Sequence, residues 1–327
     1  MRALRTVTLA VLAGTAALAG CGHHDRRRSP PPKVPKAVVA DGLIVFRATV
    51  DDDSQLFTVR PDGTGQRQIT DMRVPPGNTT GPEQPSFAPD GARIAFDASA
   101  HSDSVDLFLA RPDGSDAREV ELSVGAYNGL PDYAPDGRRL VFGQDVGDRA
   151  PLVHGLYVAD IDGTHVRRLT RGLRAEDAYD TNGAWSPDGR RIAFTRVANP
   201  QRTAIFIVDA DGGHLERLTS WRLDAENPQW SPDGRRLIFQ GHFDLATASD
   251  IFTMAPDGSE QRRLTHFRPG TNATEPYYAP DRKHVVWRKQ GVSVDELFIS
   301  DPELKTARRL THFPLGSEPG SPEWWMP

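Results

Sequence analysis

Residues Trp185 to Phe194 read Trp-Ser-Pro-Asp-Gly-Arg-Arg-Ile-Ala-Phe, and this stretch decides the fold because the chain repeats it. Related copies begin at Phe87, Tyr133, Trp230 and Tyr278, so successive copies lie 46, 52, 45 and 48 residues apart. The last copy has Arg282 where the others have glycine. A period of roughly 40 to 50 residues indicates a repeat architecture in which each period forms one supersecondary unit.

A second pattern lies between these copies. An apolar run leads into an Asp-Gly pair, as at Asp113-Gly114 and Asp211-Gly212, and Asp301-Pro302 holds the sixth equivalent place. Arg-Leu-Thr or a related triplet follows each pair, as at residues 217–219. Aspartate and glycine favour tight turns. Each period is therefore predicted to contain four strands, A to D, with tight A–B and C–D turns.

The apolar content of the strands predicts how the units pack. Strand B, as at residues 192–194, and strand C, as at residues 205–207, are continuously apolar rather than alternating. Such strands are covered on both faces. Strand D carries one leucine or isoleucine beside arginines and is expected at the exposed edge. A four-stranded unit packed between two similar units is a blade of a β-propeller.

The two ends of the repeat region complement each other. The first unit, residues 42–70, has strands B, C and D without a strand A, whereas residues 320–325 begin like another strand A. We therefore expect the C-terminal strand to complete the first blade, which removes two exposed sheet edges. Six C–D turns then predict an all-β fold with six four-stranded blades.

The Trp-Ser-Pro-Asp-Gly stretch before an apolar strand resembles the WD-like repeat of the TolB propeller family, and the resemblance covers about residues 42 to 327. It implies a six-bladed β-propeller in the periplasm that binds a peptidoglycan-associated lipoprotein and communicates with the Tol complex. Related propellers gate prolyl-oligopeptidase-type peptidases or form the body of oligogalacturonate lyases. The expected lack of the α/β domain that precedes the TolB propeller, and the lipidation signal described next, argue against a Tol-complex role.

Residues 1–20 have the features of an export signal. Arg2 and Arg5 precede an apolar run from Val7 to Leu18, which is shorter than the about 20 residues that span a bilayer. The run ends in Leu-Ala-Gly-Cys at residues 18–21, which resembles a bacterial lipobox. We therefore expect Cys21 to be acylated and to anchor the protein in a bilayer on the periplasmic or extracytoplasmic side. Cys21 is the single cysteine of the chain, so no disulfide is expected.

Residues 21–40 are rich in proline and arginine and are expected to form a tether before the propeller of residues 41–327. The arginines at positions 26–28 either contact anionic headgroups or form an ordinary solvated charge run. The net charge of −5 argues against nucleic acid as a partner. We expect a monomer whose partner is an envelope protein or a cell-wall component.

Antiparallel order places the A–B and C–D turns on one face, the turn face, and the B–C and D–A loops on the opposite face, the loop face. Binding residues concentrate on loops held by a rigid scaffold. Glu83, Glu226 and Glu275 lie three or four residues before a strand A aromatic and should surround the channel mouth. Acidic loops that only keep the protein soluble are the alternative. The predicted binding residues on this face are Glu83, Glu226, Glu275, Asp177, Asp180 and Trp221.

Catalytic patterns are hard to find. The chain has no Gly-x-Ser-x-Gly motif, and its histidines show no close pair with metal-ligand spacing. We therefore expect no catalytic residue, metal or cofactor. The alternative is a metal-dependent carbohydrate-active enzyme, similar to oligogalacturonate lyases, that uses the same loop face.

Overall fold

The computed structural model describes residues 42–73, 81–99, 104–123, 127–145, 155–171, 178–199, 202–243 and 248–327. Cys21, Asp177 and the predicted signal and tether lie outside these ranges. None of the helical structure in these ranges is long and apolar enough to cross a membrane.

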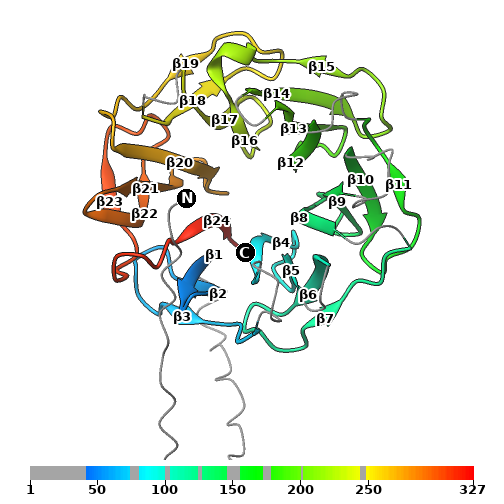
Figure 1. Ribbon diagram of the computed structural model, residues 1–327, viewed down its shortest axis with the longest axis horizontal. Helices are drawn as coiled ribbons and strands as arrows, with labels where there is room; N and C mark the ends of the chain where they lie inside the picture. Colours follow the sequence, from blue (N-terminus) through cyan, green and yellow to red (C-terminus); the bar gives the residue numbers. More distant parts are fainter. Residues whose placement is uncertain are drawn as a thin grey trace, which may run out of the picture. The chain divides into compact units, whose positions relative to one another are not determined.

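Six four-stranded antiparallel sheets stand around a common axis (Figure 1). Blade 1 contains β24 (Gly320–Trp325), β1 (Leu43–Val50), β2 (Asp53–Val59) and β3 (Arg67–Gln68). Blade 2 contains β4 (Glu83–Phe87), β5 (Ile94–Ala98), β6 (Asp106–Ala110) and β7 (Arg118–Glu119). Blade 3 contains β8 (Tyr127–Tyr133), β9 (Arg139–Asp145), β10 (Gly155–Asp160) and β11 (Arg167–Arg168).

Blade 4 contains β12 (Tyr179–Trp185), β13 (Arg191–Asn199), β14 (Arg202–Asp209) and β15 (Glu216–Arg217). A short 3-10 helix, η1 (Trp221–Leu223), leads into blade 5, which contains β16 (Glu226–Trp230), β17 (Leu237–Gly241), β18 (Asp250–Met254) and β19 (Arg262–Arg263). Blade 6 contains β20 (Thr271–Tyr278), β21 (Val285–Gly291), β22 (Val294–Ser300) and β23 (Ala307–Arg309). In each blade these strands occupy positions A to D in the order given.

The C-terminal strand closes the ring as predicted. Leu43 and Ile44 of β1 pair with Trp325 and Trp324 of β24 in antiparallel register. The six-bladed all-β fold, with its first blade completed by the C-terminal strand, is therefore confirmed.

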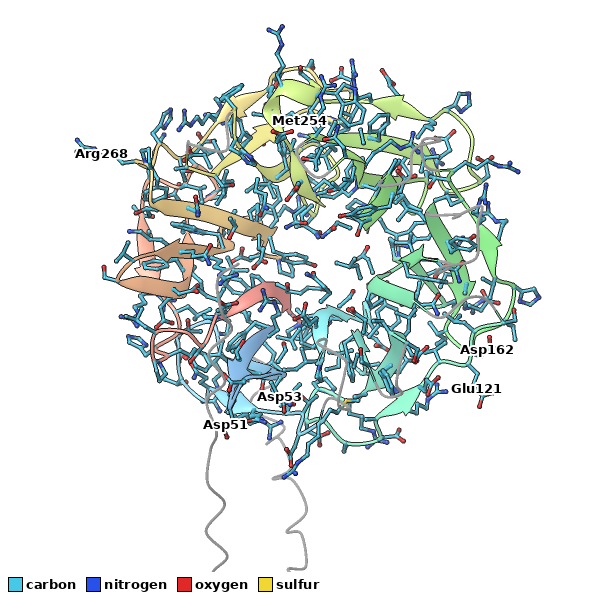
Figure 2. The ribbon with its side chains drawn as sticks, viewed as in Figure 1. Asp51, Asp53, Glu121, Asp162, Met254 and Arg268 are labelled. Atoms are coloured by element: carbon cyan, nitrogen blue, oxygen red, sulfur yellow. The ribbon has the colours of Figure 1, made fainter. Side chains whose placement is uncertain are left out.

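The core is divided into six apolar clusters, and each is shared by two neighbouring blades. Figure 2 shows side chains filling the spaces between sheets, as Met254 does in blade 5. Within every blade a buried strand B aromatic packs against a strand C aromatic, with ring centroids 5.4–6.1 Å apart. Offset stacking at this distance adds to the burial energy. Strands B and C are thus covered on both faces, as their composition predicts.

The tight turns of the turn face use the repeated aspartate as a cap. In the A–B turns of blades 2 to 6, the aspartate Oδ1 accepts the backbone N–H two residues later at 2.8–3.1 Å. The following glycine has a φ of 66–69° in blades 2 to 5, a conformation that glycine adopts without strain. The interpretation of Asp90, Asp136, Asp188 and Asp233 as turn-forming residues is confirmed.

The threonine of the Arg-Leu-Thr triplet ties the outer edge of a blade to its strand C. Strand D ends one residue before the leucine or isoleucine, and the threonine Oγ1 then accepts a strand C backbone N–H at 2.8–3.0 Å. This repeated bond holds the start of the D–A loops against the sheet.

Candidate functional site

Every strand A is interrupted by a β-bulge close to the loop face. The bulge places one residue of each blade in the left-handed region, with φ between 45° and 58°. A bulge bends its strand and redirects side chains. These six residues line a cavity of about 70 Å³, the loop-side cavity, and they are Gln84, Leu130, Asn182, Asn227, Glu275 and Ser321.

Two residues after each bulge position, six further side chains form a ring that we call the waist: Ser86, Asp132, Ala184, Gln229, Tyr277 and Glu323. Asp132, Gln229, Tyr277 and Glu323 line both the loop-side cavity and a second cavity of about 270 Å³, the turn-side cavity. The walls of the turn-side cavity are mainly prolines and aromatic rings. The waist therefore divides the central channel into two chambers.

Two carboxyl groups of the waist have raised pKa values. Asp132 accepts the backbone N–H of Trp185 at 2.8 Å, and burial raises its pKa to about 7. Glu323 is buried and accepts the N–H of Phe87 at 2.9 Å. Burial, followed by the charge of Asp132, raises the pKa of Glu323 well above its ordinary value. The waist can therefore hold protons at neutral pH.

Sequence reasoning missed the waist. Its residues precede the strand A aromatic, where Ser86, Asp132, Ala184, Gln229, Tyr277 and Glu323 differ from one another within an otherwise uniform repeat. That difference is a signal which an aligned set of the six repeats would have shown.

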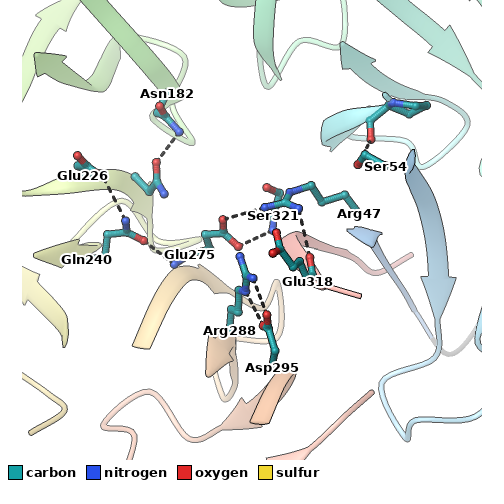
Figure 3. A network of polar contacts seen from close by, with 12 residues as sticks. Arg47, Ser54, Asn182, Glu226, Gln240, Glu275, Arg288, Asp295, Glu318 and Ser321 are labelled. Atoms are coloured by element: carbon teal, nitrogen blue, oxygen red, sulfur yellow. Dashed lines mark hydrogen bonds and ion pairs between the residues drawn. The ribbon is translucent and has the colours of Figure 1, made fainter. Parts of the chain in front are cut away.

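The three glutamates expected at the channel mouth occupy two different positions in strand A. Glu275 is a bulge residue and lines the loop-side cavity, whereas Glu83 and Glu226 lie one residue before the bulge. All three side chains are partly buried. Figure 3 shows Gln240 between Glu226 and Glu275 at this end of the channel.

Hydrogen bonds join Glu275 and Glu226 to residues of other strands. The Oε2 of Glu275 accepts the backbone N–H of Ser321 in blade 1 at 2.8 Å, and its Oε1 is 4.0 Å from the Arg47 guanidinium. Gln240 donates to Glu226 at 3.2 Å and accepts the Glu275 N–H at 2.8 Å. Burial raises the pKa of Glu226, an effect that the Gln240 bond partly offsets. Glu275 thus links blades 5, 6 and 1.

Glu83 lies beside a second acid, and neither of the two has an ion pair within the described part of the chain. It pairs in register with Asp97 of β5, which is 5% exposed and whose Oδ1 has no hydrogen-bond partner among the described residues. Burial and then the neighbouring Glu83 raise the pKa of Asp97 well above its ordinary value. Burial also raises the pKa of Glu83, although the charge of Arg47 opposes this. We call Glu83 and Asp97 the acid pair.

Asp180 is buried in an ion pair. Its carboxylate accepts from the Arg196 guanidinium at 2.6 and 2.7 Å and from the Thr170 hydroxyl at 2.6 Å. In blades 1, 5 and 6, the corresponding threonine donates to the residue just before its strand C partner. Blade 3 has Gly155 at that position, so Asp180 of blade 4 supplies the missing acceptor.

Trp221 begins η1 and is partly buried. Its ring centroid lies 5.7 Å from that of Phe206, and the Arg217 guanidinium lies 5.7 Å from the ring. The indole thus covers the outer end of a blade. Among the residues that the structure describes, no group of three or more His, Cys, Asp or Glu side chains is arranged to hold a metal ion.

Known proteins resemble this chain mainly in the propeller. A 93-residue stretch, 28% of the chain, is 33% identical to dipeptidyl-peptidase 5 of Porphyromonas endodontalis, but it spans only 12% of that protein. The structure of TolB from Acinetobacter baumannii matches with a TM-score of 0.68 at 18% identity, over 89% of this chain and 69% of that one. A putative TolB from Agrobacterium tumefaciens matches with a TM-score of 0.63 at 19% identity, over 82% of this chain and 87% of that one.

The family match extends over most of the repeat region. The TolB beta propeller domain family matches residues 85–238 and 184–324, which together cover well over half of the chain. The matched stretch begins at the first bulge of blade 2 and ends in the strand that closes the ring. The chain therefore belongs to the TolB beta-propeller domain family.

Proposed function

We propose that this protein is an exported, lipid-anchored binding module whose loop face holds a basic segment of an envelope protein. A binding or scaffold role agrees with the TolB-like propeller fold. The acid pair of Glu83 and Asp97 carries the proposal for the site. A lysine or arginine side chain placed beside this pair would stabilise the ionised carboxylates, because neither has an ion-pair partner within 4 Å among the described residues.

The surroundings of the pair also suit a protein partner. Arg47, whose charge acts on Glu83, is held by the carbonyl of Glu318 at 3.2 Å and lies 4.0 Å from Glu275. Two aromatic side chains on the same face are exposed: Phe243 by 62% and Tyr179 by 44%. Exposed aromatic anchors beside charged groups are typical of protein interfaces.

The proposed site is tested by crosslinking in membranes, followed by capture through the propeller. We expect one dominant crosslinked partner, and we expect Glu83→Gln combined with Glu226→Gln to abolish it. Asp52→Asn is the matched control, because Asp52 is an exposed acid in the B–C turn of blade 1. Glu275 is left unchanged because its carboxylate joins blade 6 to blade 1. Capture that survives the double change would contradict the loop-face site.

The anchor is tested separately at Cys21. Palmitate should label the wild-type protein, and Cys21→Ala should lose both the label and the processing of the signal segment. A labelled Cys21→Ala protein would show that the lipid is attached elsewhere or that the lipobox interpretation is wrong.

A further inference from the structure

The A–B turns of the turn face carry cations that make no side-chain bond. The residue after the turn glycine or its substitute is Ala92, Arg138, Arg190, Arg235 and Lys283 in blades 2 to 6, and all five are exposed. Among the described residues, the four charged side chains make no hydrogen bond and no ion pair within 4 Å, and the hydrogen bonds of these residues are made by their backbone groups. We call these four residues the cation crescent.

The neighbouring arginines behave differently. Arg139 forms an ion pair with Asp136 at 2.7 Å, Arg236 pairs with Glu260, and the Arg191 guanidinium lies 5.2 Å from the Trp230 ring centroid. The second arginine at positions 139 and 236 is therefore salt-bridged within the protein. In the A–B turns, the first arginine of these pairs, at positions 138, 190 and 235, is left for an external anion.

The cation crescent surrounds one end of the channel. The prolines of the same five turns, at positions 89, 135, 187, 232 and 280, line the turn-side cavity. The turn aspartates are already used within the turns, since Asp188 accepts from the Ser186 hydroxyl at 2.6 Å and from the Arg190 N–H at 3.1 Å. Asp233 has the same pair of bonds, from Ser231 and Arg235.

The propeller also begins on this face. Leu43, at the start of β1, lines a cavity together with Gly91 and Ala92 of the blade 2 A–B turn and Asp113 of its C–D turn. The described chain therefore enters its first strand at the turn face. The loop face, with Glu83, Asp97 and Glu275 at its channel mouth, lies at the opposite end.

We propose that the turn face rests on an anionic phospholipid surface, whose headgroup phosphates bind the cation crescent, and that the loop face points away from the membrane. This inference rests on the proposed lipid anchor. A tether of about 20 residues at ~3.1 Å per residue reaches about 60 Å, so it holds the propeller near the bilayer without orienting it. Each lysine or arginine near an anionic surface strengthens binding by about fivefold. The acidic mouth opposes the reverse orientation.

Fluorescence quenching on vesicles tests the orientation with the full lipidated chain. One cysteine is introduced at Ala92 on the turn face or at Val292, which is 93% exposed in the B–C turn of blade 6. Acylation removes the Cys21 thiol, so a dye attaches only to the new cysteine. The vesicles contain spin-labelled phosphatidylcholine, with or without phosphatidylglycerol.

With phosphatidylglycerol, we expect the dye at position 92 to be quenched at least several-fold more than the dye at position 292. Changing Arg138, Arg190 and Arg235 to glutamate, or raising the salt concentration, should remove this difference. The matched control reverses Arg73, Arg202 and Arg268, which are exposed on the loop face, and should keep it.

Two outcomes separate this inference from the proposed anchor. Co-flotation with neutral phosphatidylcholine vesicles reports the lipid anchor alone. Equal quenching of the two dyes on phosphatidylglycerol vesicles, or a difference that survives reversal of the crescent, would overturn the orientation even if the anchor is correct. Protein that does not float with neutral vesicles would instead refute the anchor.

Discussion

The A–B turns and the waist are formed by the same inner strands, yet one region is uniform and the other differs from blade to blade. In the turns, an aspartate caps the same backbone N–H from blade 2 to blade 6. At the waist, the equivalent position carries Ser86, Asp132, Ala184, Gln229, Tyr277 or Glu323. The repeated residues build the ring, whereas the residues that differ give its channel a chemical character.

The outer ends of the blades show the same contrast on a smaller scale. The hydroxyls of Thr70, Thr265 and Thr311 donate to an acceptor in strand C of their own blades. These acceptors are Gln55, Asp250 and Glu296. Thr170 meets Asp180 of the following blade. The same threonine hydroxyl thus donates to different partners, and the partner decides whether two blades are joined by a buried charge.

The largest expected effect comes from breaking that non-repeated contact. Arg196→Met leaves the buried Asp180 carboxylate without its guanidinium, so the free energy of unfolding should fall by about 3–5 kcal/mol. Changing both residues, Asp180→Leu with Arg196→Met, should recover part of the loss because no lone charge remains buried. Urea denaturation measures both. A loss below about 1 kcal/mol for Arg196→Met would mean that the pair behaves like an exposed surface ion pair.

The second expected effect tests whether the turns are as uniform as they look. A Cβ added to Gly91 would lie 2.2 Å from the Trp325 ring, whereas at Gly137 its nearest neighbour is Pro89 at 3.6 Å. Both glycines have a φ of 66°. Gly91→Ala should therefore cost about 2–4 kcal/mol, from backbone strain and overpacking. Gly137→Ala is the matched control and should cost about 1–2 kcal/mol, from strain alone.

Thermal or urea unfolding of the two glycine variants gives the comparison. Equal losses in the free energy of unfolding would show that the Trp325 ring can move aside at little cost, and that the contact between blades 1 and 2 contributes little to stability.

The repeat made most of the fold predictable. Identical turns and apolar strands B and C are enough to count the blades, and residues 320–325 complete the one blade that lacks a strand A. The site was less predictable. All three glutamates precede an aromatic residue, but Glu275 occupies the bulge position itself, whereas Glu83 and Glu226 lie one residue before it. Asp180 is buried because the preceding blade has Gly155 where others have an acceptor. The effect of such differences between blades can be seen only when the spatial neighbours of each residue are known.

The smallest of these expected effects is the pH dependence of stability, which has opposite signs for the waist and for the A–B turns. The folded protein raises the pKa of Asp132 to about 7, so the folded state binds this proton more tightly than the unfolded chain does. Stability should therefore fall as the pH rises from about 4 through about 7. Asp132→Asn mimics the protonated form, and it should remove on the order of 2 kcal/mol of this change between pH 5 and pH 8.

Asp188→Asn in the blade 4 turn is the control with the opposite sign. Hydrogen bonds from Ser186 and then Arg190 lower the pKa of Asp188, so its contribution is present above the pKa of the unfolded chain, about 4, and is lost as the pH falls below it. Its removal should leave the slope between pH 5 and pH 8 unchanged. Urea midpoints across this range measure both variants. A wild-type protein whose stability does not decline toward pH 8, or an Asp132→Asn variant that declines as steeply, would show that the waist carboxyl ionises freely, because solvent in the channel hydrates it as well as it does the aspartates of the turns.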